Sequence, residues 1–275
     1  DVLRTAPPYK DNRPGINRSG YYANYNSNKR SVGLNLADAR ALEIAKRLAA
    51  WADIVTENFT PGTMEGWGIG YEELRKVNPG IIMFSTSMLG RGGPYSRQPG
   101  FGPVLSSLAG MTHLTGWPDG PPSTPYGAYT DFIVPRFAVA AILAALDFRQ
   151  RTGKGQYLDL SQLECSLHFI TPVLLDYTAN GREQQRTGNR HPAAAPHNVY
   201  PCKGDVLSLP KGEERWCAIA CLTDDEWQAL CRVMGSPSWA EETRFATPAD
   251  RKAHEEELDR LMSQWTVGFE PRELM

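Results

Sequence analysis

The chain has 275 residues, of which 41% are hydrophobic and 22% charged, and its formal net charge at pH 7 is −2. This balance is typical of a soluble globular protein with one large domain or two ordinary ones, and no block of basic residues predicts a nucleic-acid or membrane surface. The longest apolar run, residues 137–146, is too short to span a bilayer.

The first half of the chain alternates between helices and short buried strands. Apolar spacing predicts a helix over 38–51, and "DIVTEN" (53–58) then forms a strand. A short helix follows Pro61-Gly62, a further helix covers 71–77, and "IIMFSTS" (81–87) is the next strand. This order predicts an α/β fold: a Rossmann-like parallel sheet with helices on its faces.

The next elements are longer and more apolar. The pattern predicts a helix through Leu105 and Met111, a long helix over 131–151, a strand over 156–160 and a long apolar helix from about Leu163.

After Gly181 the chain changes character, with a polar, Pro-rich crossing segment. A strand over 216–222, a helix capped by Thr223 and Glu226, and an amphipathic helix over 250–265 follow. We expect residues 1–190 to form a large α/β domain, and 191–275 to form a linker and part of a smaller α+β domain. The abrupt start at Asp1 indicates a piece of a longer chain.

Glu164 admits two interpretations. Ser161 stands at an N-cap position and Glu164 three residues later completes an S-x-x-E capping box, in which the glutamate ties back the first helical turn. In the other interpretation, Glu164 is a reactive carboxylate at the positive end of a helix.

Several common catalytic signatures are absent from the sequence. It has no P-loop, no G-x-G-x-x-G after a strand, no G-x-S-x-G and no H-E-x-x-H, and its histidines lack metal-ligand spacing, so no metal is expected. Five cysteines without a C-x-x-C pair favour a reducing compartment, and hence the cytoplasm, over disulfides or zinc.

A candidate ligand site remains in "TENFTPGT", at the carboxyl end of a predicted strand, where open α/β sheets bind ligands. Asn58 offers an amide, Phe59 a flat apolar face and Thr60 the start of a helix that favours phosphate. A plain turn between strand and helix, with Asn58 as a cap, explains the same residues.

Four segments together resemble the class III CoA-transferase family, also called the CaiB/BaiF type, which includes formyl-CoA transferase. They are "NYNSNKRSVGLNL", the stretch from "ADIVTENFTPGT" to "STSMLGRGGPY", "GAYTD" and "TGKGQYLDLSQLE", in that order and spacing. The resemblance covers residues 21–200. It implies coenzyme A as the acyl carrier, a CoA-binding large domain whose first strand and helix would precede Asp1, and two chains interlocked as a homodimer, with a heteromer as the alternative.

The resemblance also implies which residues contact CoA. Three cations common in the family are replaced here by Ala37, Gly66 and Pro99, and Lys29, Arg30 or Arg91 are expected to substitute for them. The implied contacts are Leu34, Leu36, Asn58, Phe59, Thr60, Gly100, Phe101 and Gly102.

Glu164 is assigned by the resemblance to the position of the family's nucleophile, an Asp that Glu lengthens by one methylene. We therefore expect an enzyme that moves CoA from an acyl-CoA donor to a carboxylic acid through a covalent glutamyl intermediate. A catalytically silent CoA-binding subunit of a heteromer is one alternative. An acyl-CoA racemase is another, although the loop "GFGPVLSS" lacks the histidine of racemases with this fold.

Overall fold

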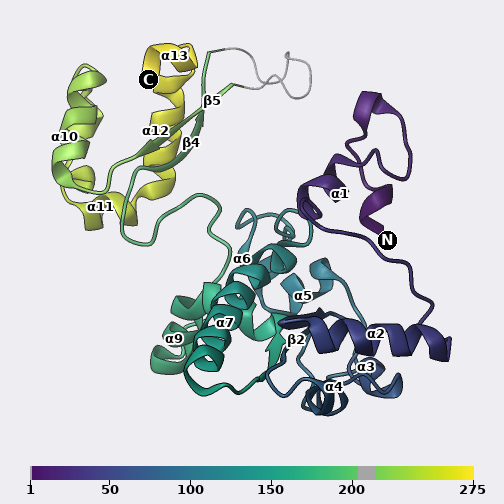
Figure 1. Ribbon diagram of the computed structural model, residues 1–275. Coiled ribbons are helices and arrows are strands. Elements are labelled where there is room, and N and C mark those ends of the chain that lie inside the picture. Colours follow the sequence, from purple (N-terminus) through teal and green to yellow (C-terminus); the bar gives the residue numbers. More distant parts are fainter. Residues whose placement is uncertain (1, 204–214) are drawn as a thin grey trace. The chain divides into compact units, whose positions relative to one another are not determined.

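A computed structural model describes residues 2–203 and 215–275 of the chain (Figure 1). The chain forms two compact units. The first comprises Asp1–Val55, Gly62–Met83 and Phe148–Tyr157, and the second comprises Thr56–Pro61, Phe84–Asp147 and Leu158–Met275. The expected domain boundary at residue 190 stays a prediction.

The helices and strands follow each other in mixed order. Up to the third strand they are α1 (Gly20–Tyr25), α2 (Ala39–Trp51), β1 (Ile54–Glu57), α3 (Thr63–Gly66), α4 (Tyr71–Val77), β2 (Ile82–Ser87), α5 (Gly102–Leu108), α6 (Met111–Leu114), α7 (Tyr129–Thr152) and β3 (Tyr157–Ser161). After it come α8 (Gln162–Leu167), α9 (Thr171–Asn180), β4 (His197–Pro201), β5 (Trp216–Ala220), α10 (Asp224–Val233), α11 (Pro248–Ala253), α12 (Glu255–Thr266) and α13 (Pro271–Leu274). Short 3₁₀ turns cover Val2–Thr5, Lys10–Asn12, His168–Ile170, Ser238–Glu241 and Thr243–Phe245.

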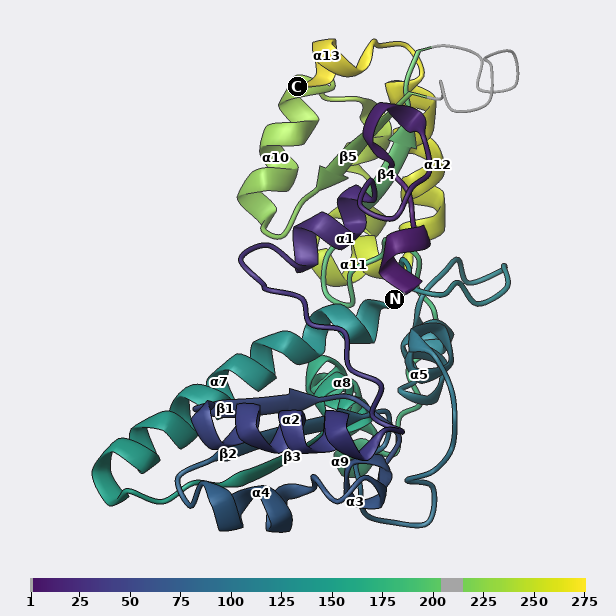
Figure 2. The ribbon, with the colours of Figure 1, turned by 45° about the vertical axis from the view of Figure 1, so that its right-hand side comes forward.

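Strands β1, β2 and β3 form one sheet in that order (Figure 2). The Met83 N–H donates to the Gln156 carbonyl at 3.0 Å, and the Thr86 hydroxyl donates to the Leu160 carbonyl at 3.0 Å. Residue numbers thus rise together along β2 and β3, which makes the pairing parallel. The predicted mixed α/β architecture with a parallel sheet is confirmed.

The core of the first unit packs beneath α2 and α4. Buried side chains from both helices, from the turn that holds α3 and from the start of β2 make up this cluster: Ala49, Met64, Ile69, Leu74, Ile81 and Met83. Asp38 caps α2 by accepting the Arg40 N–H at 2.9 Å. This helix begins and ends where its apolar spacing predicts.

Gly155 is required by the approach of two backbone segments just before β3. A Cβ atom at this position would lie 2.0 Å from the carbonyl oxygen of Ile81. We expect Gly155→Ala to lower the free energy of unfolding by about 1–3 kcal/mol, because the strands would have to separate. Gly66→Ala is the matched control, since nothing lies within 4 Å of its added methyl group. Equal urea midpoints for the two variants would contradict this account.

Two helices predicted as continuous are interrupted. The helix through Leu105 and Met111 divides into α5 and α6 at Gly110, whose φ of +83° lies in the left-handed region that glycine adopts readily. The long apolar helix predicted from Leu163 divides into α8 and α9 around the 3₁₀ turn His168–Ile170. The break lies at Ile170, whose φ and ψ of −112° and 18° are not helical, and Pro172 in the first turn of α9 has no N–H to donate to the turn before it.

The predicted helix over 250–265 is also two helices, α11 and α12. They are separated by His254, whose φ and ψ of −114° and 27° are not helical. Apolar periodicity continues across such a break because both helices face the same core, so the spacing alone does not reveal it.

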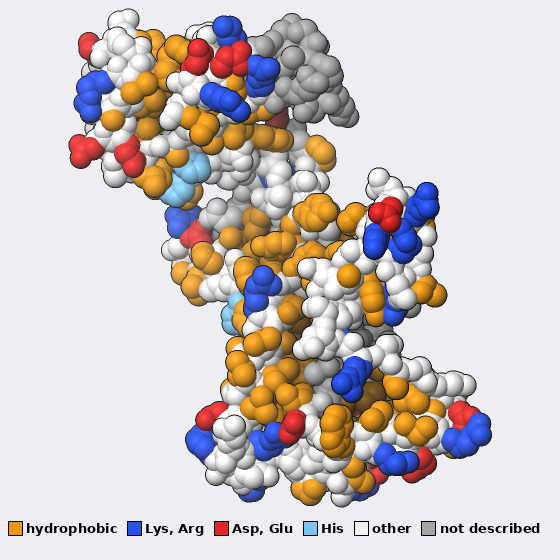
Figure 3. Space-filling view, turned by 45° about the horizontal axis from the view of Figure 1, so that its top comes forward, with side chains coloured by type: hydrophobic (Ala, Val, Ile, Leu, Met, Phe, Trp, Pro, Cys, Tyr) orange, Lys and Arg blue, Asp and Glu red, His pale blue; other side chains and the backbone are white. Residues whose placement is uncertain are grey.

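Large apolar side chains are exposed on several parts of the surface (Figure 3). Tyr126 and Phe101 are among the most exposed, at 92% and 84%. Within residues 2–203 and 215–275, no helix is both long and apolar enough to cross a membrane. All five cysteines are free thiols.

The last part of the chain builds a separate apolar core. Strands β4 and β5 pair antiparallel, with Tyr200 opposite Cys217, and the core includes Tyr200, Trp227, Phe245, Leu258 and Met262. The predicted capping box is confirmed: Thr223 accepts the Glu226 N–H, and the Glu226 carboxylate accepts the Thr223 N–H at 3.0 Å. Strand β4 was not predicted, because it lies in the polar, Pro-rich crossing segment.

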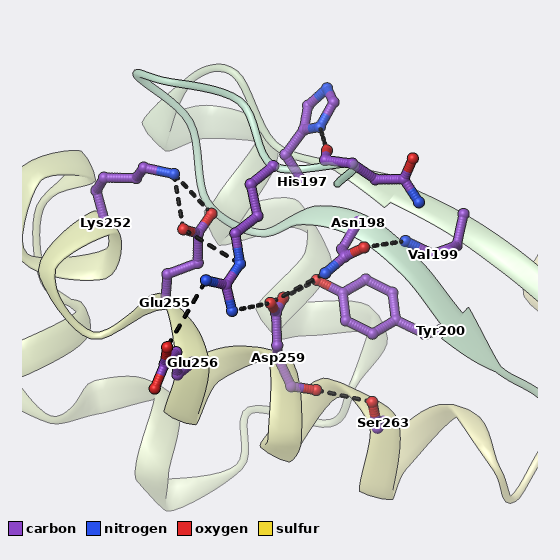
Figure 4. A network of polar contacts seen from close by, with 11 residues as sticks. His197, Asn198, Val199, Tyr200, Lys252, Glu255, Glu256, Asp259 and Ser263 are labelled. Atoms are coloured by element: carbon purple, nitrogen blue, oxygen red, sulfur yellow. Dashed lines mark hydrogen bonds and ion pairs between the residues drawn. The ribbon is translucent and has the colours of Figure 1, made fainter. Parts of the chain in front are cut away.

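A polar network holds β4 against α12 (Figure 4). The Asp259 carboxylate accepts the Tyr200 hydroxyl at 2.7 Å and the Asn198 amide at 3.0 Å, and it pairs with Arg190 at 3.4 Å. Burial, followed by the charge of Asp259, raises the pKa of the Tyr200 hydroxyl, so Tyr200 stays a neutral donor. Asp259 thus has partners for its charge and its oxygens, and the network joins the crossing segment to the C-terminal core.

Candidate active site

The carboxyl ends of the three parallel strands are Glu57, Ser87 and Ser161. In an open α/β sheet the loops that follow these ends are the usual place for a ligand. The candidate site is built from the loop after β1, the loop after β2 and the start of α8, which directly follows β3.

The loop after β1 carries Asn58, Phe59 and Thr60, all exposed to solvent. Its conformation is set by Glu57, whose buried carboxylate accepts the Phe59 N–H at 2.8 Å. The turn is thus capped by Glu57 rather than by Asn58. The amide of Asn58 and the ring of Phe59, which is 43% exposed, lie at the predicted edge of the sheet.

The loop after β2 joins the other two segments. The Arg91 guanidinium pairs with the Glu57 carboxylate at 3.3 Å, and its backbone N–H donates to Asp159 at 3.0 Å. The Met88 carbonyl accepts the Leu163 N–H at 2.9 Å. The loop after β1, the loop after β2 and the first turn of α8 therefore form one contiguous surface.

Glu164 lies in the first turn of α8 and is exposed. The Ser161 hydroxyl accepts the Glu164 N–H at 3.3 Å, which is one half of the predicted capping box. The other half is wrong: among the described residues the Glu164 carboxylate accepts no hydrogen bond, from the Ser161 N–H or elsewhere. Burial first, and the charge of Glu164 second, raise the pKa of the neighbouring Cys165 thiol.

Gly100, Phe101 and Gly102 lead from the loop after β2 into α5. A Cβ at Gly100 would lie 2.7 Å from the Met88 side chain, and one at Gly102 would lie 2.4 Å from Cβ of Ala128. Both glycines therefore permit close packing, and Phe101 between them is 84% exposed. This segment touches the loop after β2 on one side and the start of α7 on the other.

Asp131, in the first turn of α7, is a carboxylate that is not among the predicted site residues. Its side chain reaches solvent, yet burial raises the pKa of the carboxyl. Ile133 of α7 and Leu163 of α8 pack in one apolar cluster with Met111, so the helix starts that carry Asp131 and Glu164 are neighbours. The available signal was "GAYTD", which carries the family resemblance and ends in this aspartate.

Leu34 and Leu36 are half-buried in the segment before α2 and belong to the first unit. That Leu34 and Leu36 contact CoA stays a prediction. Of the three cations expected to hold phosphate, Lys29 donates to the Tyr25 carbonyl at 2.9 Å and Arg91 pairs with Glu57. Arg30 is exposed and has no partner among the described residues, and which of the three cations holds phosphate stays a prediction.

Comparisons with known proteins identify the family of the chain. The family model described as CoA-transferase family III matches residues 1–275. No group of three metal-ligating side chains that could hold an ion occurs in the described part of the chain.

Three curated relatives carry CoA-transferase names. The succinyl-CoA–D-citramalate CoA-transferase of Chloroflexus aurantiacus is 37% identical, over 88% of this chain and 58% of the relative. The acetyl-CoA:oxalate CoA-transferase of Acetobacter aceti is 35% identical, over 94% and 63%. The succinyl-CoA–L-malate CoA-transferase beta subunit of Chloroflexus aurantiacus is 32% identical, over 90% and 60%. The chain thus spans less than two thirds of the length of these relatives.

A solved structure covers the whole chain. The CAIB/BAIF family protein from Brucella suis superposes with a TM-score of 0.86 at 30% identity, over 100% of this chain and 70% of its own.

Proposed function

The chain belongs to CoA-transferase family III, and on that premise we propose that the protein transfers CoA from an acyl-CoA donor to a carboxylic acid acceptor. The observation that carries the proposal is the contiguous surface at the carboxyl edge of the sheet, where the Asn58–Thr60 loop meets the loop after β2 and the first turn of α8. Relatives named for citramalate, malate and oxalate support a small dicarboxylic acid as one substrate.

The proposed reaction proceeds through a side-chain carboxylate. The carboxylate oxygen attacks the thioester carbonyl, which forms a mixed anhydride and releases the CoA thiolate. The thiolate attacks the side-chain carbonyl of the anhydride, which releases the donor acid and leaves CoA bound to the protein as a thioester. The acceptor acid then attacks this thioester, and the same two steps in reverse yield the new acyl-CoA. Such covalent catalysis divides one difficult displacement into easier ones.

Two carboxylates compete for the role of nucleophile. Glu164 is the residue assigned from the sequence, and its carboxylate is unpaired among the described residues. Asp131 is favoured, because it is an aspartate at the end of the "GAYTD" segment and stands in the first turn of the long helix α7, next to the start of α8. Partial burial, which raises the pKa of its carboxyl, is typical of catalytic carboxylates.

The silent-subunit alternative keeps one specific observation in its favour, the relative named as a beta subunit. Asp131 counts against the silent subunit, because it offers a second carboxylate that could react even if Glu164 does not.

We propose an interlocked homodimer in the cytoplasm, with a heteromer as the alternative. The family resemblance supports the dimer, and the five free thiols support a reducing location. An assay of the purified full-length protein alone, with a panel of acyl-CoA donors and dicarboxylic acids, separates enzyme from silent subunit.

Asn58→Ala and Phe59→Ala should each weaken CoA binding by about tenfold, because a hydrogen-bonding amide or an aromatic face is removed. Calorimetry with CoA on the full-length protein measures this. Val233→Ala, at an exposed position of α10, is the control and should bind as wild type does. Unchanged affinity in both loop variants would show that this loop does not hold CoA.

A further inference from the structure

Glu57 and Arg91 form an ion pair that is largely removed from water. The two side chains are 3% and 16% exposed, and the Arg91 guanidinium lies 3.3 Å from the Glu57 carboxylate. The sequence predicts no role for Glu57, and it predicts Arg91 only as one of three cations that could hold phosphate. A buried ion pair usually stabilises a fold no more than apolar residues of the same size would. The pair at this edge of the sheet is therefore not explained by stability alone.

The pair connects the last residue of β1 to the loop after β2. The second oxygen of Glu57 accepts the Phe59 N–H at 2.8 Å, which fixes the loop after β1. The backbone N–H of Arg91 donates to Asp159 at 3.0 Å, which fixes the loop after β2 against β3. One ion pair therefore sets the position of Phe59 relative to the segment that contacts the start of α8.

We propose that Glu57 and Arg91 are positioning residues that hold the Asn58–Thr60 loop in its CoA-binding arrangement; this inference rests on the proposed function. The pair itself need not touch CoA, since its side chains are covered and already matched in charge. Its loss should therefore weaken CoA binding, raising KM for the acyl-CoA more than it lowers kcat.

The test uses Glu57→Gln in the full-length protein. Glutamine is isosteric and keeps an oxygen for the Phe59 N–H, so only the charge of the pair is lost. We expect the Kd for CoA to rise about tenfold or more, with kcat within about threefold of wild type. Arg91→Gln should show the same split, and the double variant should be no worse than either single variant, because both remove one interaction.

The same strand provides a matched control at its other end. Arg149 donates to the Asp53 carboxylate at 2.9 Å and to the Gly80 carbonyl at 3.3 Å, just before β1 and β2 begin. Arg149→Gln removes an arginine–aspartate contact away from the loops, and it should lower thermal stability while leaving the Kd for CoA unchanged.

The outcomes separate the inference from the function. If wild type binds CoA and Glu57→Gln binds it equally well, the positioning role is wrong and the proposed function stands. The positioning role is also wrong if Arg149→Gln loses as much affinity as Glu57→Gln, since the effect is then general destabilisation. If wild type neither binds CoA nor transfers it, the proposed function fails and the inference fails with it.

Discussion

Asp131→Asn should reduce CoA transfer by about a thousandfold or more, with the fold intact. Asparagine matches the shape of aspartate but cannot attack a thioester as a carboxylate does, and loss of a nucleophile costs several orders of magnitude in turnover. The measurement is kcat on the full-length protein, with circular dichroism to confirm that α7 is retained.

The same variant should be more stable than wild type at neutral pH. Burial raises the pKa of the Asp131 carboxyl above its ordinary value of 3.8, so the folded protein holds this proton to a higher pH than the unfolded chain does. Stability therefore falls as pH rises from that ordinary value through the folded pKa, and it stays reduced at higher pH. Asparagine removes this penalty, so the gain in Tm should be present at pH 7 and should disappear at pH below 3.8.

Glu164→Gln is the matched comparison. Its N–H keeps the bond to Ser161, because that bond involves only the backbone of residue 164. If Asp131 is the nucleophile, Glu164→Gln should retain transfer within about tenfold of wild type. The reverse pattern, with Asp131→Asn active and Glu164→Gln inactive, would assign the chemistry to Glu164, as the sequence alone predicts.

Arg251→Met should lower the free energy of unfolding of the C-terminal core by about 2–4 kcal/mol. The Arg251 side chain is 1% exposed and donates to the carbonyls of Ala195 and Phe245 at 3.0 and 3.2 Å. It also pairs with Asp224 at 2.8 Å. Methionine fills much of the volume but leaves two buried carbonyls without a donor, and each lost partner is costly in a dry interior.

Denaturant unfolding followed by tryptophan fluorescence measures this effect, since Trp227 lies in the same core. The neighbouring Lys252→Met is the control. Among the described residues Lys252 pairs only with Glu255, in a partly exposed contact, so its loss should cost no more than about 1 kcal/mol. If Arg251→Met were as stable as Lys252→Met, the buried hydrogen bonds of Arg251 would not stabilise this core as we expect.

The parallel sheet was predictable because its signals are local. Buried strands such as 81–87 read as short apolar runs, and the helices between them carry apolar spacing, caps and glycine ends. The breaks at Gly110 and just before Pro172 were marked by residues that disfavour helix, but the apolar spacing continues across them. Strand β4 could not be found in the same way, because it lies in a polar, Pro-rich segment and its pairing with β5 is not a local signal.

The candidate site was predictable in place but not in detail. Strand ends can be located from sequence, so the position of Asn58 and Phe59 follows from the end of β1. The partner of Glu57 does not follow, because Arg91 lies 34 residues away and only the fold brings it close. The partial burial that raises the pKa of the Asp131 carboxyl is likewise a property of the packed structure, whereas S-x-x-E draws attention to Glu164 through its spacing alone.

The central claim, transfer through a carboxylate of this chain, is tested most directly by trapping the protein-bound intermediate. The full-length protein is incubated with acyl-CoA, treated with hydroxylamine and digested with trypsin, which places Asp131 in the peptide 98–136 and Glu164 in the peptide 155–182. We predict a hydroxamate on Asp131, found by tandem mass spectrometry and absent without acyl-CoA. Active transfer with no modified carboxylate in either peptide would contradict the claim.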